Sequence, residues 1–234
     1  MRTILRVLIA SAALASGTFA AENPRVLIKT QLGDIVAEIF QDKAPVTAAN
    51  FLRYVDAGLY DDSTFFRTVK MDNQPNNKIK IEVIQAADLP EAKNFPPIPL
   101  ERTSVTGVKH VDGALSMARG GPDTAQSSFS ICINDQPELD FGGKRNPDGQ
   151  GFAAFGKVVS GMDVVRAIQA RPAEGQTLKP PIKIMTISRI EGPARIMVKA
   201  FRDVSFGLSP GGVGLAVYDP GSSKYGWHII KRLE

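Results

Sequence analysis

Alternating apolar and polar positions dominate the chain after residue 24 and predict a protein built mainly from β-strands. The first such run, RVLIKTQLGDIVAEIF, is interrupted by QLGD, where Gly33 can adopt a positive φ angle, so the run predicts a hairpin. Six further strand-like runs are separated by stretches rich in Gly, Pro, Asn and Asp: STFFRTV, IKIEVIQAA, GALSMA, SFSICIN, FAAFGKVV and PPIKIMTISRIEG.

Two segments have helical rather than strand spacing. After the hairpin, Pro45 stands near a helix start, apolar residues such as Phe51 and Val55 recur on one face, and Gly58 fits the end. A second helix is predicted from Met162 to Ala170. Many short strands with two isolated helices favour a mainly β fold, namely a closed barrel whose ends the helices cap.

The first twenty residues have the pattern of a secretory signal peptide. Arg2 and Arg6 precede an apolar stretch from Val7 to Ala15, and small residues follow as far as Ala20. The stretch is too short for a spanning helix, which needs about 20 apolar residues. We therefore expect cleavage after Ala20 and a secreted protein without membrane insertion, which would be periplasmic in a Gram-negative cell.

The composition changes after Pro193, where the chain becomes rich in glycine and has turn signals of its own. About forty residues rarely bury enough surface to fold alone. We therefore expect residues 193–234 to form a C-terminal extension, a hairpin docked on the main domain rather than an independent unit.

Composition excludes several classes of function. The net charge of +4 is reduced by two once Arg2 and Arg6 are removed, which gives no reason to expect nucleic-acid binding. Cys132 is the only cysteine, so no disulfide can form within the chain, and its apolar surroundings predict a buried thiol. With only two histidines, a zinc site is not expected, and we expect no metal and no cofactor.

The candidate chemistry centres on Arg67, which follows two phenylalanines in the run STFFR. A guanidinium stays charged at working pH and can bind or polarise an oxygen, but it cannot act as a base. No serine lies in a nucleophile-elbow pattern, so a Ser-His-Asp triad is poorly supported. One interpretation is a buried structural arginine paired with a backbone carbonyl.

The other interpretation is a reaction without a covalent step, and rotation about a prolyl amide bond is the prime example. This rotation meets a barrier of about 18–20 kcal/mol because amide resonance is lost in the twisted state. An apolar pocket that holds the proline ring, with a donor that favours the twisted amide, would lower the barrier. Arg67 could be that donor.

Longer segments carry a resemblance to a known family. GALSMARGGPDTAQSSFSICIND, followed by ELDFGGKRNPDGQGFAAFGKVVSGMDVV, resembles the central signature of the cyclophilin family of peptidyl-prolyl cis-trans isomerases, and STFFR with VIQAAD resembles its segment bearing the catalytic arginine. The resemblance extends from Arg25 to Glu191. It implies a closed eight-stranded antiparallel β-barrel capped by two α-helices, with an active site on one outer face.

The resemblance also implies roles for individual residues. Arg67 matches the catalytic arginine and Gln85 the glutamine that orients it. The implied substrate-binding residues are Phe66, Val83, Ala118, Ser128, Ser130, Leu139 and Phe152. Where the family usually has aromatic or long apolar residues on the pocket floor, this chain is expected to have Glu82, Val83 and Ser130, which predicts a more polar floor and weaker substrate binding.

These observations predict an exported peptidyl-prolyl isomerase, a monomer that binds proline-containing segments of client proteins and assists their folding. Two alternatives remain. The same barrel could be a noncatalytic module or chaperone that binds proline-containing peptides without turning them over. The second alternative is a structural component whose C-terminal segment carries the partner contact.

Overall fold

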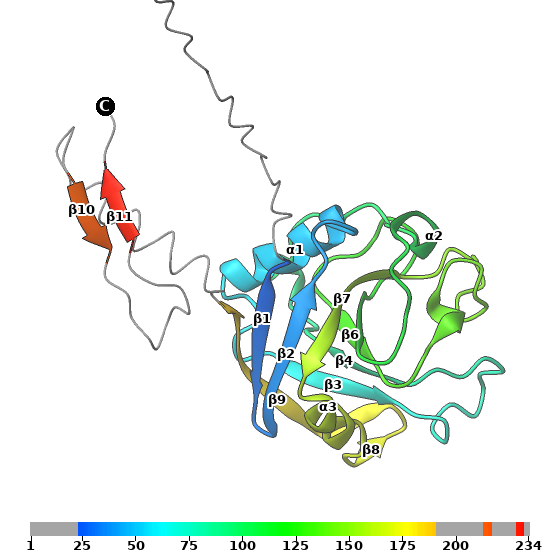
Figure 1. Ribbon diagram of the computed structural model, residues 1–234. Helices are drawn as coiled ribbons and strands as arrows, with labels where there is room; N and C mark the ends of the chain where they lie inside the picture. The colour runs from blue at the N-terminus through cyan, green and yellow to red at the C-terminus, as the bar shows by residue number, and fades with distance from the viewer. Residues whose placement is uncertain (1–22, 191–212, 217–227, 232–234) are drawn as a thin grey trace, which may run out of the picture.

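The computed structural model describes residues 23–190, 213–216 and 228–231. Most strands form one nine-stranded sheet, in the order β1-β2-β7-β5-β6-β4-β3-β9-β8 (Figure 1). The strands are β1 Arg25–Thr30, β2 Gly33–Ile39, β3 Thr64–Val69, β4 Val83–Ala86, β5 Ala114–Met117, β6 Phe129–Cys132, β7 Ala153–Ser160, β8 Ala173–Glu174 and β9 Thr177–Ile190.

The sheet closes on itself because β1 pairs with β2 along one edge and with β9 along the other. Every pairing is antiparallel, and the two-residue strand β8 lies outside the ring, paired with β9 alone. The result is a closed eight-stranded antiparallel β-barrel, as predicted. The predicted hairpin is β1–β2, and Gly33 at its turn has a φ of 136°.

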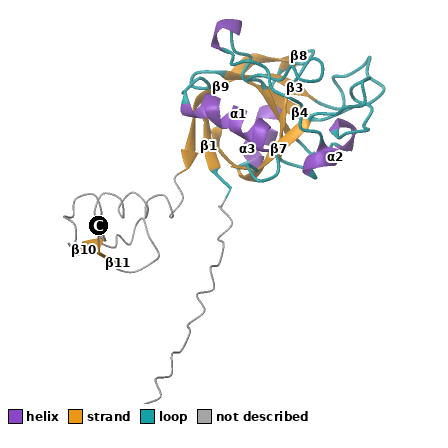
Figure 2. Ribbon diagram, turned by 90° about the horizontal axis from the view of Figure 1, so that it is seen from above, coloured by secondary structure: helices purple, strands orange, loops and turns teal. Residues whose placement is uncertain are grey.

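The two predicted helices lie across opposite ends of the barrel (Figures 1 and 2). Helix α1, Pro45–Asp56, contacts β7 and β9, and helix α3, Met162–Gln169, contacts β2, β3 and β4. The structure adds three short turns that the apolar pattern did not predict: α2, Thr103–Thr106, and the 3₁₀ turns Glu91–Lys93 and Pro137–Leu139. Each is too short to show a helical period.

The barrel interior is filled by aromatic and aliphatic side chains. Phe51 of α1 reaches into it and packs against Phe129 and Phe155, with ring centroids 5.2 and 5.1 Å apart. Phe65 is fully buried in the same core. Cys132 is also fully buried, which confirms the predicted buried thiol. Burial raises the pKa of this thiol.

One predicted strand is shorter than its pattern suggested. IKIEVIQAA becomes a strand only from Val83, because the preceding residues form a loop organised around a buried glutamine. The Gln74 amide Nε2 donates to the carbonyls of Lys70 and Ile81, at 2.7 and 2.8 Å, while Oε1 accepts from Ile81 N at 3.2 Å. This loop positions Ile81 at the edge of the site described below.

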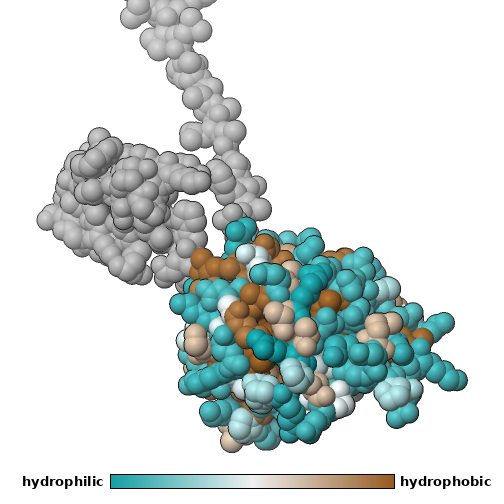
Figure 3. All heavy atoms as spheres, turned by 90° about the horizontal axis from the view of Figure 1, so that it is seen from below, coloured by the Kyte–Doolittle hydropathy of each residue, from teal (hydrophilic) through white to brown (hydrophobic). Residues whose placement is uncertain are grey.

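The face of the barrel domain seen from below is mainly polar (Figure 3). On the face shown in Figure 3, most residues are hydrophilic and the hydrophobic ones form small groups among them. Within the described ranges, no helix has the length and apolar character needed to cross a membrane. The same residues contain no cluster of three or more His, Cys, Asp or Glu side chains that could hold a metal ion.

Both ends of the chain fall largely outside the described residues. The predicted signal peptide, residues 1–20, lies outside them entirely. Within the predicted extension, strands β10, Val213–Ala216, and β11, His228–Lys231, pair antiparallel as a two-stranded sheet. Most of residues 193–234 lie outside the described ranges, so the docking of this hairpin on the barrel stays a prediction.

Candidate active site

A β-bulge in β3 turns Arg67 to the outside of the barrel. Phe65 pairs with Ala86 and Arg67 with Gln85, so Phe66 is an extra residue of β3 against β4. The register also shifts against β9, but there the extra residues lie on β9, since Phe65 pairs with Ile182 and Arg67 with Thr177. In a regular strand, Phe65 and Arg67 would point to the same face. The bulge lets Phe65 fill the core while Arg67 points outward.

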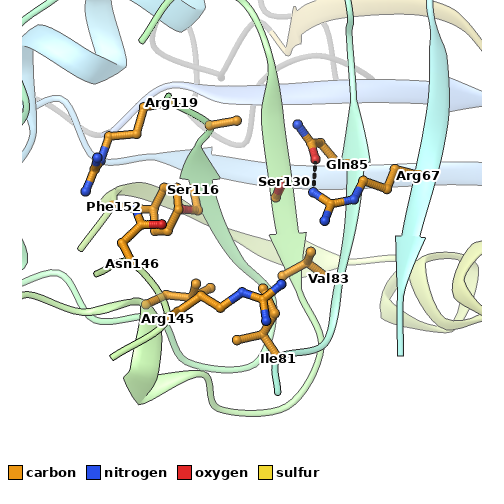
Figure 4. A pocket seen from close by; sticks show the side chains of 12 residues that line it. Arg67, Ile81, Val83, Gln85, Ser116, Arg119, Ser130, Arg145, Asn146 and Phe152 are labelled. Carbon is orange, nitrogen blue, oxygen red and sulfur yellow. Dashed lines mark hydrogen bonds between the residues drawn. The ribbon is translucent and has the colours of Figure 1, made fainter. Parts of the chain in front are cut away.

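Two neutral amides hold the Arg67 guanidinium. Gln176, in the turn between β8 and β9, accepts hydrogen bonds at Oε1 from Arg67 Nε and Nη2, at 2.9 and 2.5 Å. Gln85 Oε1 on β4 accepts from Nη1 at 2.9 Å (Figure 4). Because neither partner is charged, the positive charge of Arg67 is not neutralised by these contacts.

A second layer holds Gln85 itself. Its Nε2 donates to Ser128 Oγ at 3.0 Å, and that hydroxyl donates to the carbonyl of Ala86, also at 3.0 Å. These two bonds fix the orientation of the Gln85 amide and of the Ser128 hydroxyl. Ser128 thus acts on the site through Gln85.

Arg67 lies at one side of a pocket on the outer face of the barrel (Figure 4). Its strand wall consists of residues on the adjacent strands β3, β4, β6 and β5: Arg67, Val83, Gln85, Ser130 and Ser116. Its loop wall consists of residues from the loops that face these strands: Ile81, Ala118, Arg119, Leu139, Arg145, Asn146 and Phe152. The pocket volume is about 250 Å³, below the roughly 300–1,000 Å³ typical of sites for drug-sized ligands. This size suits a ring or single side chain.

Seven of the nine site residues inferred from the resemblance line this pocket, and two do not. Ser128 lies in a neighbouring hollow that shares Gln85, Ala118 and Arg119 with the pocket. Phe66, the bulged residue, is half-buried and is not among the lining residues.

The pocket floor also differs from the sequence expectation at one position. Val83 and Ser130 line the pocket, but Glu82 does not. Glu82 directly precedes β4 and lies between Ile81 and Val83, which both line the pocket, so the alternation of side chains places it on the other side. Its carboxylate accepts instead from Asn134 Nδ2 at 2.8 Å and from Gln169 Nε2 at 3.4 Å. The polar character of the floor thus comes from Ser130 rather than from Glu82.

The three arginines of the pocket have different environments. The Arg119 side chain is 1% exposed and pairs with Asp148 through two hydrogen bonds of 2.8 and 3.0 Å, while its Nε and Nη2 also donate to the carbonyl of Gly151. A hydrogen bond from Arg119 lowers the pKa of the Asp148 carboxyl. Arg119 is therefore neutralised and fastens the chain before Phe152.

Arg67 and Arg145 have no such carboxylate partner within the described part of the chain. Arg145 Nη1 donates to Gln74 Oε1 at 3.0 Å and to the carbonyl of Ile79 at 2.7 Å. Burial, and then the nearby charge of Arg145, lower the pKa of the Arg67 guanidinium. Both groups still carry a positive charge at neutral pH.

Behind the pocket lies a chain of hydrogen bonds that the sequence did not predict. The ring of His110, 1% exposed, contacts Ser116 Oγ through Nε2 at 2.9 Å and Asp140 Oδ1 through Nδ1 at 2.8 Å. Ser116 lies within β5, paired with Ser130, rather than at a sharp strand-to-helix turn. The chain therefore fixes the position of Asp140 next to Leu139.

Comparisons with known proteins agree with this architecture. The sequence profile described as "Cyclophilin type peptidyl-prolyl cis-trans isomerase/CLD" matches residues 25–189. A peptidyl-prolyl cis-trans isomerase of Acinetobacter baylyi is 34% identical over 188 residues, covering 78% of this chain and 94% of that protein. Peptidyl-prolyl cis-trans isomerase B of Escherichia coli is 34% identical over 145 residues, covering 62% of this chain and 83% of that protein.

Solved structures show the same fold. A cyclophilin-type isomerase from Cryptosporidium parvum superimposes with a TM-score of 0.59 at 24% identity, covering 73% of this chain and 99% of that one. A structure of the same isomerase in the presence of the dipeptide Ala-Pro gives a TM-score of 0.58 at 23% identity, covering 72% and 99% of the two chains. From the profile match and the sequence identities together, the chain belongs to the cyclophilin-type peptidyl-prolyl cis-trans isomerase family.

Proposed function

We propose that this protein accelerates cis–trans isomerisation of prolyl bonds in exported polypeptides, with Arg67 as the catalytic residue. The observation that carries the proposal is the Arg67 guanidinium, which is charged, held by the neutral amides of Gln85 and Gln176, and open to an outer pocket. A group of this kind can donate hydrogen bonds to a substrate amide, and it takes no proton from it.

The hydrogen bonds of Arg67 leave part of its guanidinium for substrate. Of the five N–H groups of a guanidinium, Nε–H and one N–H each of Nη1 and Nη2 are used by the two glutamines. One N–H remains on each terminal nitrogen. When the prolyl bond twists, resonance is lost and the nitrogen becomes a better acceptor, so these donors stabilise the twisted state more than either planar isomer.

The remaining walls would hold the proline ring. Leu139, Phe152 and Val83 supply apolar surface, and Ala118 leaves space between them. Ser130 on the floor provides less apolar area than an aromatic residue would, a difference of about 1.5–3 kcal/mol if fully buried. We therefore expect weak substrate binding, with turnover determined separately by Arg67.

Location outside the cytoplasm forms part of the proposal and is supported by the N-terminal sequence alone. Arg2, Arg6 and the apolar stretch after them match a signal peptide. N-terminal sequencing of the protein from a periplasmic or culture fraction should give Ala21 as the first residue. Recovery of the uncleaved chain from the cytoplasm would contradict export and leave the isomerase proposal intact.

The noncatalytic alternative keeps one observation in its favour, the polar floor at Ser130. A binding module would hold proline peptides with measurable affinity and leave their exchange rate unchanged. The two functions are separated by NMR exchange spectroscopy, in which the cis–trans exchange rate of a proline peptide is measured with wild-type protein and with Arg67→Ala.

Arg67→Ala should lower the catalysed exchange rate by about 10²–10³-fold, because removing one transition-state donor has effects of that size in other enzymes. The variant must still give the wild-type amide NMR spectrum outside the pocket, which controls for folding. Equal acceleration by wild type and a folded Arg67→Ala variant would rule out the proposed role of the guanidinium.

A further inference from the structure

Arg145 gives the pocket a second guanidinium whose role the isomerase proposal does not use. It lies in the loop between the turn Pro137–Leu139 and β7, and its side chain enters the pocket alongside Ile81 and Val83 (Figure 4). Its backbone N–H donates to the carbonyl of Glu138 at 3.2 Å, and the side chain is anchored by Gln74 and Ile79. The guanidinium is thus held in place at the pocket edge.

Most donors of Arg145 have no protein acceptor within the described residues. Both anchoring contacts use Nη1, which leaves the N–H of Nε and both N–H groups of Nη2. Nε–H and one Nη2–H of a guanidinium form the parallel pair that binds both oxygens of a carboxylate. The Nε–H and Nη2–H groups of Arg145, which suit a carboxylate best, are therefore the ones without a partner in the described residues.

The charge of the pocket also favours binding of an anion. Its twelve lining residues include Arg67, Arg119 and Arg145, and no aspartate or glutamate. Asp148 neutralises Arg119, so the uncompensated positive charge comes from Arg67 and Arg145. Two like charges in a partly desolvated pocket repel each other, and a bound anion would relieve that repulsion.

We propose that Arg145 binds a carboxylate close to the proline, so that the protein prefers segments with Asp or Glu next to proline. The inference rests on the proposed function, since it assigns the pocket a substrate class. Arg67 acts on the prolyl amide, and Arg145 acts on the acidic side chain of the neighbouring residue. In a partly desolvated pocket the attraction between the two charges is screened less than it is on an open surface.

The carboxylate could come from a side chain or from a chain that ends in proline, and the choice of peptides distinguishes the two. Four acetylated and amidated pentapeptides carry Glu or Gln either directly before or directly after the proline. A fifth peptide has neutral side chains and a free carboxylate on a C-terminal proline. For each, NMR titration gives the Kd and exchange spectroscopy gives the catalysed rate.

With wild-type protein, the Glu peptide should bind about tenfold more tightly than its Gln counterpart at one or both positions, an effect typical of a charge-assisted pair. Raising the salt concentration should reduce this ratio. If only the fifth peptide shows tighter binding, or if Glu and Gln peptides bind equally, the side-chain preference is refuted.

The matched variants are Arg145→Gln, Arg145→Lys and Lys144→Gln. Lys144 is exposed and does not line the pocket, so Lys144→Gln removes the same charge one residue away. With Arg145→Gln, the Glu and Gln peptides should bind with equal Kd. With Arg145→Lys, part of the preference for Glu should remain, because the charge is kept but the paired donors are lost. With Lys144→Gln, the preference for Glu should equal that of wild type. A ratio that survives in a folded Arg145→Gln variant contradicts the proposal.

The result also separates this inference from the proposed function. Acceleration of Gln and Glu peptides with equal Kd would leave the isomerase standing and overturn the acidic preference. Tight, Arg145-dependent binding of Glu peptides without acceleration of any peptide would support the acidic preference and overturn the isomerase proposal.

Discussion

The two walls of the pocket differ in how they hold their arginines. On the strand wall, Arg67 projects from a barrel strand and is held by the amides of Gln85 and Gln176. On the loop wall, Arg119 is neutralised by Asp148 and binds the carbonyl of Gly151. The difference shows that lining a pocket does not by itself define a role. A guanidinium whose N–H groups are already bonded to protein acceptors has few donors left for a substrate.

The partners decide which arginine can act. An amide partner orients a guanidinium and leaves its charge in place, whereas a carboxylate partner orients it and cancels the charge. On this basis we propose that the strand wall carries the chemistry and that the loop wall carries shape and, through Arg145, selectivity. Three changes test this division, beginning with the one that should have the largest effect.

The first change replaces the glutamines that hold Arg67. Gln176→Met should lower the catalysed rate about tenfold, because Arg67 would lose two of its three hydrogen bonds and sample unproductive positions. Gln85→Met removes one bond and should have a smaller effect. Both should reduce kcat more than they raise KM in the exchange assay.

The control for these variants is on the other wall. Asp148→Asn weakens the pairing of Arg119 and leaves the bonds of Arg67 in place, so it should change KM more than kcat. A loss of kcat in Asp148→Asn as large as in Gln176→Met would contradict the division of labour between the walls.

The second change concerns Asp140, which joins the loop wall to β5 through His110 and Ser116. Asp140→Asn should reduce the free energy of unfolding by about 1–3 kcal/mol, measured by urea denaturation at pH 7, because a buried charge-assisted hydrogen bond is weakened. Asp42→Asn, at an exposed position, is the matched control and should change little.

The pH dependence of this effect has a defined sign. Burial alone would raise the pKa of the Asp140 carboxyl, but hydrogen bonding and charge from His110, with Lys109, hold that pKa below its ordinary value of 3.8. The stabilisation is therefore complete above pH 3.8 and is lost as the pH falls below it. The difference between wild type and Asp140→Asn should shrink on acidification, and a constant difference would assign the effect to packing.

The third change restores apolar surface to the pocket floor. Ser130→Met should tighten binding of a neutral proline peptide about fivefold, since part of a long side chain would be buried against the ring. The catalysed rate at saturating peptide should stay close to that of wild type, because Arg67 is untouched. Weaker binding by a folded Ser130→Met variant would place the proline ring elsewhere.

The strand wall was largely predictable from the sequence because its features are local. Alternating residues mark the strands, and the STFFR and VIQAAD segments identify Arg67 and Gln85. The β-bulge at Phe66 was not predictable, since regular alternation would place Phe65 and Arg67 on one face. Phe66 was expected in the pocket and is absent from its lining.

The loop wall, and the contact of Gln176 with the strand wall, were predictable only in part because these contacts join distant segments. Gln176 bonds to a residue 109 positions away, and Arg145 bonds to Gln74 across 71 positions. No spacing in the sequence marks such pairs, and a loop without periodicity gives no register from which to place a side chain. Gln176 is brought near Arg67 by the pairing of Arg67 with Thr177 and by the hydrogen bond from Thr68 N to the carbonyl of Gln176, at 2.9 Å.

The most direct test of catalysis by this pocket is the cis–trans exchange rate of a neutral proline peptide at a protein-to-peptide ratio of about one to fifty. At that ratio weak binding leaves most peptide free, so only turnover can change the rate of the whole population. If the pocket is catalytic, the exchange rate should be well above the uncatalysed value and should rise in proportion to the protein concentration. An exchange rate equal to that of peptide alone, with folded protein that still binds the peptide, would contradict the account and identify a binding module.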